Sequence, residues 1–232
     1  MLKDILNFRR AVRYYAPTPI SEEKVRECLK LATLAPTSSN MQLYELYHIT
    51  DKALLEKLAH ACLDQHTATT AQQMVVFVTR QDKHRTHARA ILEFERGNVQ
   101  RNSPSERQAK RIKDKEAYYS KLMPFVYSRF FGLLGLFRKA FGVVTSWFRP
   151  MMQQLSEGDI RVSVHKSCGL VAQTFMLAMA EEGYDSRRIK KLLHLPCGAE
   201  VNMVITCGLR EQRGIWGERF RLPFEEVYRH ND

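Results

Sequence analysis

Ala35-Pro36-Thr37-Ser38-Ser39-Asn40-Met41-Gln42 is the stretch from which the fold of this chain can be worked out. Before it, Ser21 is placed to cap a helix with apolar residues at helical spacing, and Pro36 ends that helix. The run itself supplies hydroxyl and amide groups but no acid or base, so it suits hydrogen bonding to a polar ligand better than proton transfer. Ordinary capping of a helix end by Ser and Asn is the structural alternative.

Arginines stand near both ends of the chain, in Arg9-Arg10-Ala11-Val12-Arg13 and in Arg219-Phe220-Arg221-Leu222-Pro223. A guanidinium group is always charged, and its planar fork matches the oxygens of a phosphate. The two clusters therefore predict that distant segments hold one anionic group between them. Surface charge on a first helix is the alternative for Arg10 and Arg13, and a solvated tail is the alternative for the second cluster.

Helical and strand patterns alternate irregularly, without a βαβ rhythm or a Gly-x-Gly-x-x-Gly turn. The patterns typical of strands cover 45–50, 74–79 and 201–208. The patterns typical of helices cover 51–62, 82–121 with a loop near 98–104, 162–182 and 189–193. Helices outnumber strands, so the sequence predicts an α+β fold.

The chain of 232 residues has a formal net charge of +11 and a pI of about 9.6, which favours anionic partners such as phosphorylated cofactors, acidic lipids or nucleic acid. Basic residues are dense from Lys83 to Lys121, but acidic residues are interleaved with them and no nucleic-acid-binding motif is present. We interpret that segment as a solvated helical face and expect no nucleic acid partner.

The five cysteines are widely spaced and include no Cys-x-x-Cys pair, which indicates neither a disulfide framework nor a zinc site. The N-terminus lacks the apolar core of a signal peptide. A reducing cytoplasm is therefore the expected compartment.

The first arginine cluster, the Ala35–Gln42 run and the basic pair before the tail occur in the order found in the FMN-dependent nitroreductase family, which this chain resembles over roughly 1–95 and 160–232. The resemblance implies a mainly antiparallel sheet flanked by helices. It also implies a homodimer whose protomers exchange terminal segments, with active sites at the subunit interface. On this view 1–232 is one nitroreductase-like domain, with a family-atypical helical and apolar insertion at about 98–158.

The resemblance further implies which residues bind the cofactor, FMN. Arg9 matches the family's phosphate-binding arginine, and Gln65 matches the residue that meets the pyrimidine edge of the flavin, although a surface glutamine is the alternative there. The cofactor-binding residues implied are Arg9, Arg10, Ala11, Arg13, Ser38, Ser39, Asn40, Gln42, Gln65, Arg219 and Arg221. No catalytic acid or base and no metal ligand is expected, because the isoalloxazine ring itself accepts and returns the hydride.

Two places depart from the family pattern. Leu43-Tyr44 replaces a Pro-Trp pair, and we expect this to change packing rather than cofactor affinity. Gly183-Tyr184-Asp185-Ser186 is shorter than the family's segment, whose backbone approaches the flavin. Either this wall of the pocket is lacking or residues are missing between Gly183 and Asp185. We favour missing residues, and a direct peptide bond from Tyr184 to Asp185 would contradict that.

From Phe125 to Phe148 the chain is aromatic and apolar, with three charged side chains, Arg129, Arg138 and Lys139. These charges argue against a membrane-spanning helix, which needs about 20 largely apolar residues. Two interpretations of 125–150 stay open: an insertion buried over the flavin pocket or dimer surface, and an interfacial helix whose aromatic face enters lipid. We favour the first, because a long apolar insertion is most easily buried against a partner subunit.

The leading hypothesis is a cytoplasmic NAD(P)H-dependent flavin oxidoreductase of the nitroreductase type. FMN would take a hydride from NADH or NADPH and then reduce a small electron-poor acceptor, nitroaromatic or quinone-like, by a ping-pong mechanism. The competing hypothesis is a basic peripheral protein that binds membranes or nucleic acid without redox turnover. The protein would be membrane-peripheral if 125–150 meets lipid.

Overall fold

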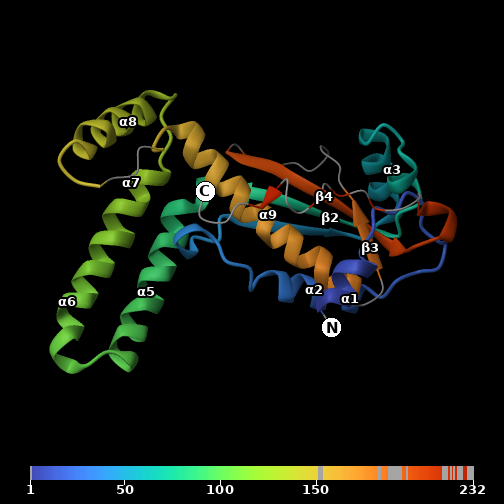
Figure 1. Ribbon diagram of the computed structural model, residues 1–232, viewed down its shortest axis with the longest axis horizontal. Coiled ribbons are helices and arrows are strands. Elements are labelled where there is room, and N and C mark those ends of the chain that lie inside the picture. Colours follow the sequence, from blue (N-terminus) through green and yellow to red (C-terminus); the bar gives the residue numbers. More distant parts are fainter. Residues whose placement is uncertain are drawn as a thin grey trace.

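The computed structural model describes residues 2–150, 154–181, 184–187, 195–196 and 198–215, together with five residues of the C-terminal tail. Four strands form one antiparallel sheet in the order β1-β2-β4-β3 (Figure 1). They are β1 (Tyr44–Ile49), β2 (Gln73–Arg80), β3 (Tyr184–Arg187) and β4 (Ala199–Leu209). The α+β class and the antiparallel sheet expected from the sequence are confirmed.

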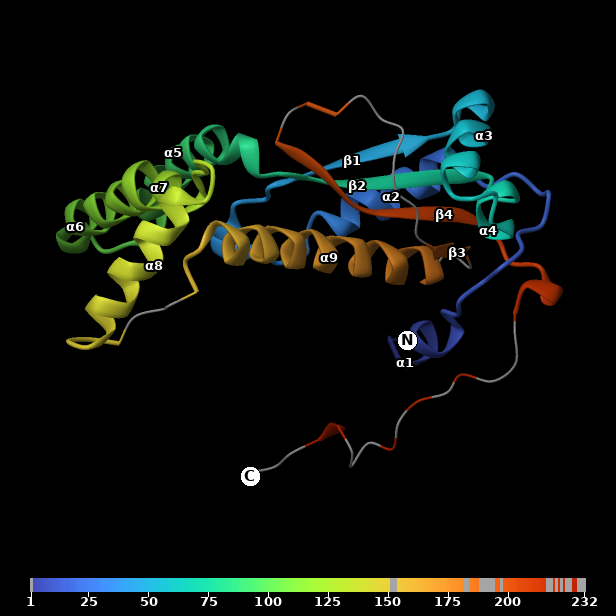
Figure 2. The same ribbon diagram turned by 90° about the horizontal axis from the view of Figure 1, so that it is seen from above.

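β2 lies inside the sheet, and all eight of its residues are buried. On one face, Val75 and Phe77 pack with α2 (Glu22–Ala32) and α9 (Glu157–Glu181). On the other face, Met74, Val76 and Val78 pack with α3 (Lys52–Ala61). Successive side chains of a strand point to opposite faces, so the continuous apolar run of β2 results from helices covering both sides (Figure 2).

The helices next to the sheet begin at the caps expected from the sequence. The Ser21 hydroxyl accepts a hydrogen bond from Lys24 N at the start of α2, and the Asp51 carboxylate accepts one from Leu54 N at the start of α3. The long helix α9 begins at Glu157, five residues before the boundary predicted at 162. The helix predicted at 189–193 lies outside the described residues.

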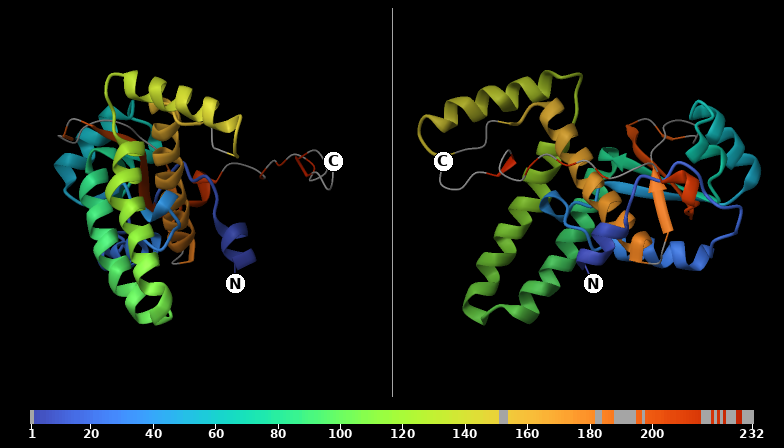
Figure 3. Two further views of the ribbon diagram at one scale, coloured as in Figure 1. Left: turned by 90° about the vertical axis from the view of Figure 1, so that its left-hand side faces the viewer. Right: turned by 45° about the vertical axis from the view of Figure 1, so that its right-hand side comes forward.

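After β2 the chain leaves the sheet and builds a helical arm, which we define as residues 84–146. Its elements are α5 (His84–Asn102), α6 (Ser105–Glu116), a π-helix (Ala117–Leu122), α7 (Met123–Tyr127) and α8 (Leu133–Ser146). α5 and α6 lie side by side as an antiparallel pair, and α8 projects near α7 and the start of α9, at the end of the arm opposite the turn between α5 and α6 (Figures 1 and 3). The loop predicted near 98–104 is wrong in extent, because α5 continues through Asn98 to Asn102.

The arm packs against the N-terminal half of α9 rather than against the sheet. Ile91 of α5, Tyr119 of the π-helix and Met123 of α7 share a hydrophobic cluster with Ile160 and Val164 of α9. Across the described ranges of the chain, no helix combines the length and apolar character needed to cross a membrane.

β3 is a strand that the sequence patterns did not predict. Tyr184 and Asp185 pair with the consecutive residues Leu209 and Gly208 of β4, so the chain passes from Tyr184 to Asp185 without a gap. The expectation of residues missing between them is therefore wrong at this peptide bond, whereas Gly183 lies outside the described residues.

The base of the arm is joined to the sheet through Glu200 of β4. Its carboxylate accepts hydrogen bonds from Arg129 at 3.1 Å, Arg161 at 2.6 Å and His165 at 2.9 Å. Burial alone would raise the pKa of Glu200, but the hydrogen bonds from His165, Arg161 and Arg129 outweigh it and lower the pKa to about 2. The ionised carboxylate thus ties the arm, α9 and β4 together.

We expect the Glu200→Gln variant to lose about 1 kcal/mol of unfolding free energy at neutral pH, because charge-assisted hydrogen bonds become neutral ones. The folded-state pKa lies below the usual 4.5, so this stabilisation is present above pH 4.5 and is lost as the pH falls toward 2. Urea unfolding of both proteins across this range measures the difference. A difference that stays constant with pH would contradict the assignment.

Candidate functional site

The C-terminal arginine Arg219 reaches the end of α1 (Leu2–Phe8). Its guanidinium donates hydrogen bonds to the carbonyl oxygens of Leu6 at 3.0 Å, Asn7 at 3.4 Å and Arg9. Carbonyls at the end of a helix carry partial negative charge and attract a cation. The two chain ends therefore meet where Arg9 and Arg10 follow α1, whereas Arg221 is an exposed residue.

A further arginine joins this group that the sequence reasoning missed. Arg210 directly follows β4, donates to the Phe8 carbonyl at 3.3 Å and lies over the Phe8 ring at 3.8 Å. We call Arg9, Arg10, Arg210 and Arg219 the arginine cluster. Nothing in the local sequence around Arg210 marks it, because its role arises from the pairing of its strand with the N-terminal segment.

The segment after the arginine cluster is held against the sheet by backbone and side-chain contacts. Arg13 N donates to the Gly214 carbonyl at 2.9 Å. The buried Tyr15 hydroxyl hydrogen-bonds both the backbone carbonyl and the hydroxyl of Thr206, at 3.1 and 2.9 Å. The Tyr15 side chain lies directly over Gly208, where a Cβ atom would come 2.7 Å from its ring. This glycine allows the N-terminal segment to approach β4.

Gln65 lies beside the same N-terminal segment, just before α4 (His66–Thr69). The His66 ring stacks on Tyr14 at a centroid distance of 4.6 Å, and Tyr15 N donates to the Thr70 hydroxyl at 3.1 Å. Gln65 is exposed, and its backbone carbonyl accepts the first hydrogen bonds of the helix. Ala11 and Arg13 are also exposed.

The polar loop at Ser38–Gln42 has an unusual backbone, since Ser39, Asn40 and Gln42 all adopt positive φ angles near 50°. The Ser38 amide donates to the Ser167 hydroxyl of α9 at 3.1 Å, which anchors the loop. The Gln42 side-chain amide donates to Asn40 Oδ1 at 3.2 Å. Strained backbone of this kind is concentrated at functional sites, where the surrounding structure holds it in place.

Two tyrosines of the arm contact the polar loop. The Ser39 hydroxyl hydrogen-bonds the Tyr118 hydroxyl at 2.8 Å, and the Tyr119 hydroxyl donates to the Ser39 carbonyl at 3.2 Å. Both tyrosines belong to the π-helix, a rare form often found at functional sites. Burial raises the pKa of Tyr119, so its phenol stays protonated and remains a donor. The sequence reasoning missed both tyrosines, although an adjacent tyrosine pair within a charged helical stretch was a usable signal.

A cavity of about 600 Å³ opens beside the polar loop, between the arm and α9. Its wall combines hydroxyl groups of the loop and the π-helix with apolar side chains, one aspartate (Asp159) and one lysine. The residues that define it include Ser38, Ser39, Tyr118, Met123, Ile160 and Lys166. Ligand cavities are typically of this size and mostly apolar with a few polar groups.

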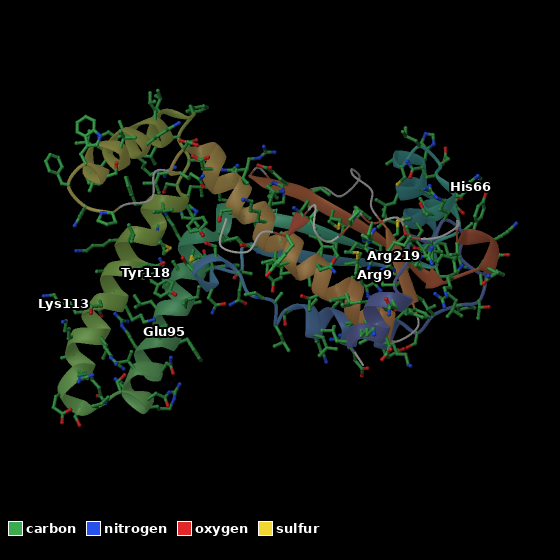
Figure 4. The ribbon with its side chains drawn as sticks, viewed as in Figure 1. Arg9, His66, Glu95, Lys113, Tyr118 and Arg219 are labelled. Carbon is green, nitrogen blue, oxygen red and sulfur yellow. The ribbon has the colours of Figure 1, made fainter. Side chains whose placement is uncertain are left out.

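The predicted site residues thus form two groups on one chain. The polar loop leads into β1, and Arg80 N at one end of β2 donates to the Leu43 carbonyl. Ala16 of the N-terminal segment instead accepts a hydrogen bond from Gln72, just before the opposite end of β2. Those ends are about 23 Å apart at 3.3 Å per residue. Figure 4 shows Arg9, Arg219 and His66 around one end of the sheet and Tyr118 on the arm at the other.

Known proteins are similar to this chain in sequence or in architecture. A relative from Bacillus subtilis, MhqN, is 20% identical over 231 residues, which cover 96% of this chain and 95% of that protein. The crystal structure of a nitroreductase-like protein from Streptococcus mutans matches with a TM-score of 0.70 and 19% identity, covering 100% of both chains. The NADPH:FMN oxidoreductase of Vibrio harveyi, solved in complex with NAD+, matches with a TM-score of 0.63 and 17% identity over 100% of this chain and 77% of that one.

The family model described as the nitroreductase family matches residues 6–209. That range includes the arginines of 9–13, the polar loop, the whole sheet and the helical arm. The resemblance noted in the sequence is therefore confirmed, and this chain belongs to the nitroreductase family.

Proposed function

We propose that the protein is a flavin oxidoreductase that binds FMN, is reduced by NADH or NADPH, and passes two electrons to a small electron-poor acceptor. The observation that carries this proposal is the meeting of Arg219 with Arg9 at the end of α1, in a chain of the nitroreductase family. The Vibrio harveyi structure with the same fold is that of an NADPH:FMN oxidoreductase, which supports the choice of cofactor and reductant.

We infer that the arginine cluster binds the phosphate of FMN, with Arg219 and Arg210 holding the end of α1 through its backbone carbonyls. A phosphate ester carries close to two negative charges and three acceptor oxygens, and convergent guanidinium forks complement both features. Arg9 and Arg10 come from one end of the chain, Arg219 comes from the other, and Arg210 comes from the end of β4. Arg219 also fixes the carbonyl end of α1, so it would position the cluster as well as add charge.

The polar loop fits the other end of the cofactor. Ser38, Ser39, Asn40 and Gln42 offer hydroxyl and amide groups that can pair with the alternating donors and acceptors of a flavin or its ribityl chain. Because this loop and Gln65 lie near opposite ends of β2, a second copy of the chain would supply the loop to a site built on the first. We therefore propose a homodimer with two shared sites.

The cavity beside the polar loop is our proposal for the acceptor site. Its apolar wall with the Tyr118 hydroxyl and Lys166 suits a small aromatic molecule that bears polar oxygens, such as a quinone or a nitroaromatic. When bound, FMN supplies the hydride chemistry itself. The residues of this chain then bind the phosphate, orient the ring and shape the cavity.

The test is anaerobic mixing of the purified protein, saturated with FMN, with NADH and with NADPH. We expect the yellow flavin absorbance to bleach with at least one nicotinamide and to return when a quinone or nitroaromatic is added. A colourless protein that takes up no added FMN would refute the proposal. If the protein binds FMN but neither NADH nor NADPH reduces it, the part of the proposal that names the nicotinamides as reductants is refuted.

A further inference from the structure

Helix α8 carries its apolar face outward. The side chains at intervals of three and four residues on that face are aromatic or aliphatic and exposed, a pattern that forms one stripe along a helix. We define the α8 stripe as Leu136, Phe137, Phe141, Val144, Trp147 and Phe148, the last two just beyond the helix end. Phe137 is 64% exposed and Phe148 is 83% exposed.

The inward face of α8 is polar and fixed in place. Arg138 is only 2% exposed and donates hydrogen bonds to the carbonyls of Phe125 at 2.7 Å, Ser128 at 2.9 Å and Leu155 at 3.1 Å. Gly135 faces α9 so closely that a Cβ atom there would lie 2.4 Å from the backbone nitrogen of Glu157. α8 therefore cannot rotate to bury its stripe without breaking these contacts.

Glu157, at the start of α9, also holds the beginning of α8. Its carboxylate accepts hydrogen bonds from the backbone amides of Phe130 at 2.9 Å, Gly132 at 3.0 Å and Gly135 at 3.3 Å. An acidic group at the N-terminus of a helix satisfies amides that have no partner within the helix. The orientation of the stripe is thus set by polar contacts at several points.

The segment that carries the stripe is basic, and the acids nearest to it, Glu157 and Asp159, stand at the start of α9. Between Ala117 and Ser156 the sequence contains no Asp or Glu but five basic residues, Lys121, Arg129, Arg138, Lys139 and Arg149. Lys139 on α8 and Arg149 after it are exposed. Aromatic residues beside lysine and arginine are typical of surfaces that meet anionic lipid headgroups.

The size of the stripe argues against a second copy as its occupant. A helix of 14 residues is about 21 Å long and about 10–12 Å wide, so its footprint of roughly 250 Å² is well below the ~800 Å² that each partner buries in a stable interface. α8 stands at an extremity of the molecule, where a flat surface can reach it (Figure 3).

We propose that the α8 stripe inserts into the interfacial region of an anionic lipid membrane, with Lys139 and Arg149 close to the lipid phosphates. This goes beyond the proposed redox function and does not depend on it. It takes up the second of the two interpretations of 125–150 that the sequence left open, the interfacial helix, in place of the insertion over the flavin pocket or dimer surface. A helix lying in the membrane interface needs no spanning segment.

The experiment is sedimentation of the full chain with vesicles of phosphatidylcholine, with and without about one third phosphatidylglycerol. We expect binding to the anionic vesicles, and at least a tenfold loss of binding in the triple variant Phe137→Ser, Phe141→Ser, Trp147→Ser. The Lys139→Gln, Arg149→Gln variant should bind anionic vesicles more weakly and resemble the wild type on neutral ones. Raising the salt to ~1 M should also weaken binding, because the Debye length falls to about 3 Å.

Phe94→Ser is the matched control, because Phe94 lies on α5 and is 63% exposed, nearly the same as Phe137. This variant should bind vesicles as the wild type does. Circular dichroism and FMN binding should be unchanged in all variants, since the replaced side chains lie outside the core. The proposal is overturned if the wild type ignores anionic vesicles or if the triple variant binds them equally well. It is also overturned if the triple variant changes only the molecular mass in light scattering, which would identify the stripe as a contact between copies.

Discussion

The Gly208→Ala variant should lose about 1–3 kcal/mol of unfolding free energy, the range measured when a methyl group is forced into a packed core. The added Cβ atom would lie 2.7 Å from Cγ and 2.8 Å from Cβ of Tyr15. The tyrosine cannot move aside freely, because its hydroxyl is held by Thr206 through two hydrogen bonds. The N-terminal segment would therefore separate from β4.

Chemical denaturation measures the stability of this variant, and FMN titration measures its site. We expect weaker FMN binding as well, since the segment that Tyr15 anchors also carries Arg9 and Arg10. Gly169→Ala in α9 is the control: a Cβ atom there meets nothing within 4 Å, and alanine in a helix should add about 0.5–1 kcal/mol. If the Gly208→Ala protein is as stable as the wild type, the prediction is wrong and the Tyr15 side chain can shift to make room for the added methyl group at little cost.

The sheet and its neighbouring helices were predictable because local patterns determine them. The apolar run of β2 indicated a strand buried on both faces, and the caps at Ser21 and Asp51 marked the starts of α2 and α3. β3 escaped prediction because Tyr184–Arg187 is short and mixed in character, and it becomes a strand only by pairing with β4.

The candidate site was predictable in composition but not in arrangement. The arginines at both chain ends were identified from their sequence clusters, and the structure brings Arg219 to Arg9. Arg210 was missed because it is positioned by strand pairing. Tyr118 was missed although it stands beside Tyr119 in a charged helical stretch, because its place in the site depends on a π-helix. The outward face of α8 could not be predicted either, since a periodic stripe does not reveal which side of a helix the protein covers.

Arg219→Ala should weaken FMN binding about 10- to 100-fold, because a charge-assisted hydrogen bond contributes ~1.5–3 kcal/mol and ~1.4 kcal/mol corresponds to a factor of ten. The variant also removes the donors that hold the carbonyls of Leu6, Asn7 and Arg9, so the arginine cluster would lose its alignment. Arg219→Lys keeps the positive charge but lacks the planar fork, so its affinity for FMN should lie between those of the wild type and of Arg219→Ala. Fluorescence titration with FMN measures all three proteins. The control is Arg107→Ala on the exposed surface of α6, and equal affinity in the Arg219→Ala and Arg107→Ala proteins would refute a phosphate role for Arg219.

Mixing two inactive variants tests whether the site is shared between copies. One chain carries Arg9→Ala with Arg219→Ala, and the other carries Ser39→Ala with Asn40→Ala. If each site takes arginines from one protomer and the polar loop from its partner, a mixed dimer contains one site with both parts intact, and NAD(P)H oxidation reappears when the chains are unfolded and refolded together. If each chain builds its own site, both sites of the mixed dimer stay defective and no activity returns. The separation of the loop from the N-terminal segment along β2 makes recovery the expected result.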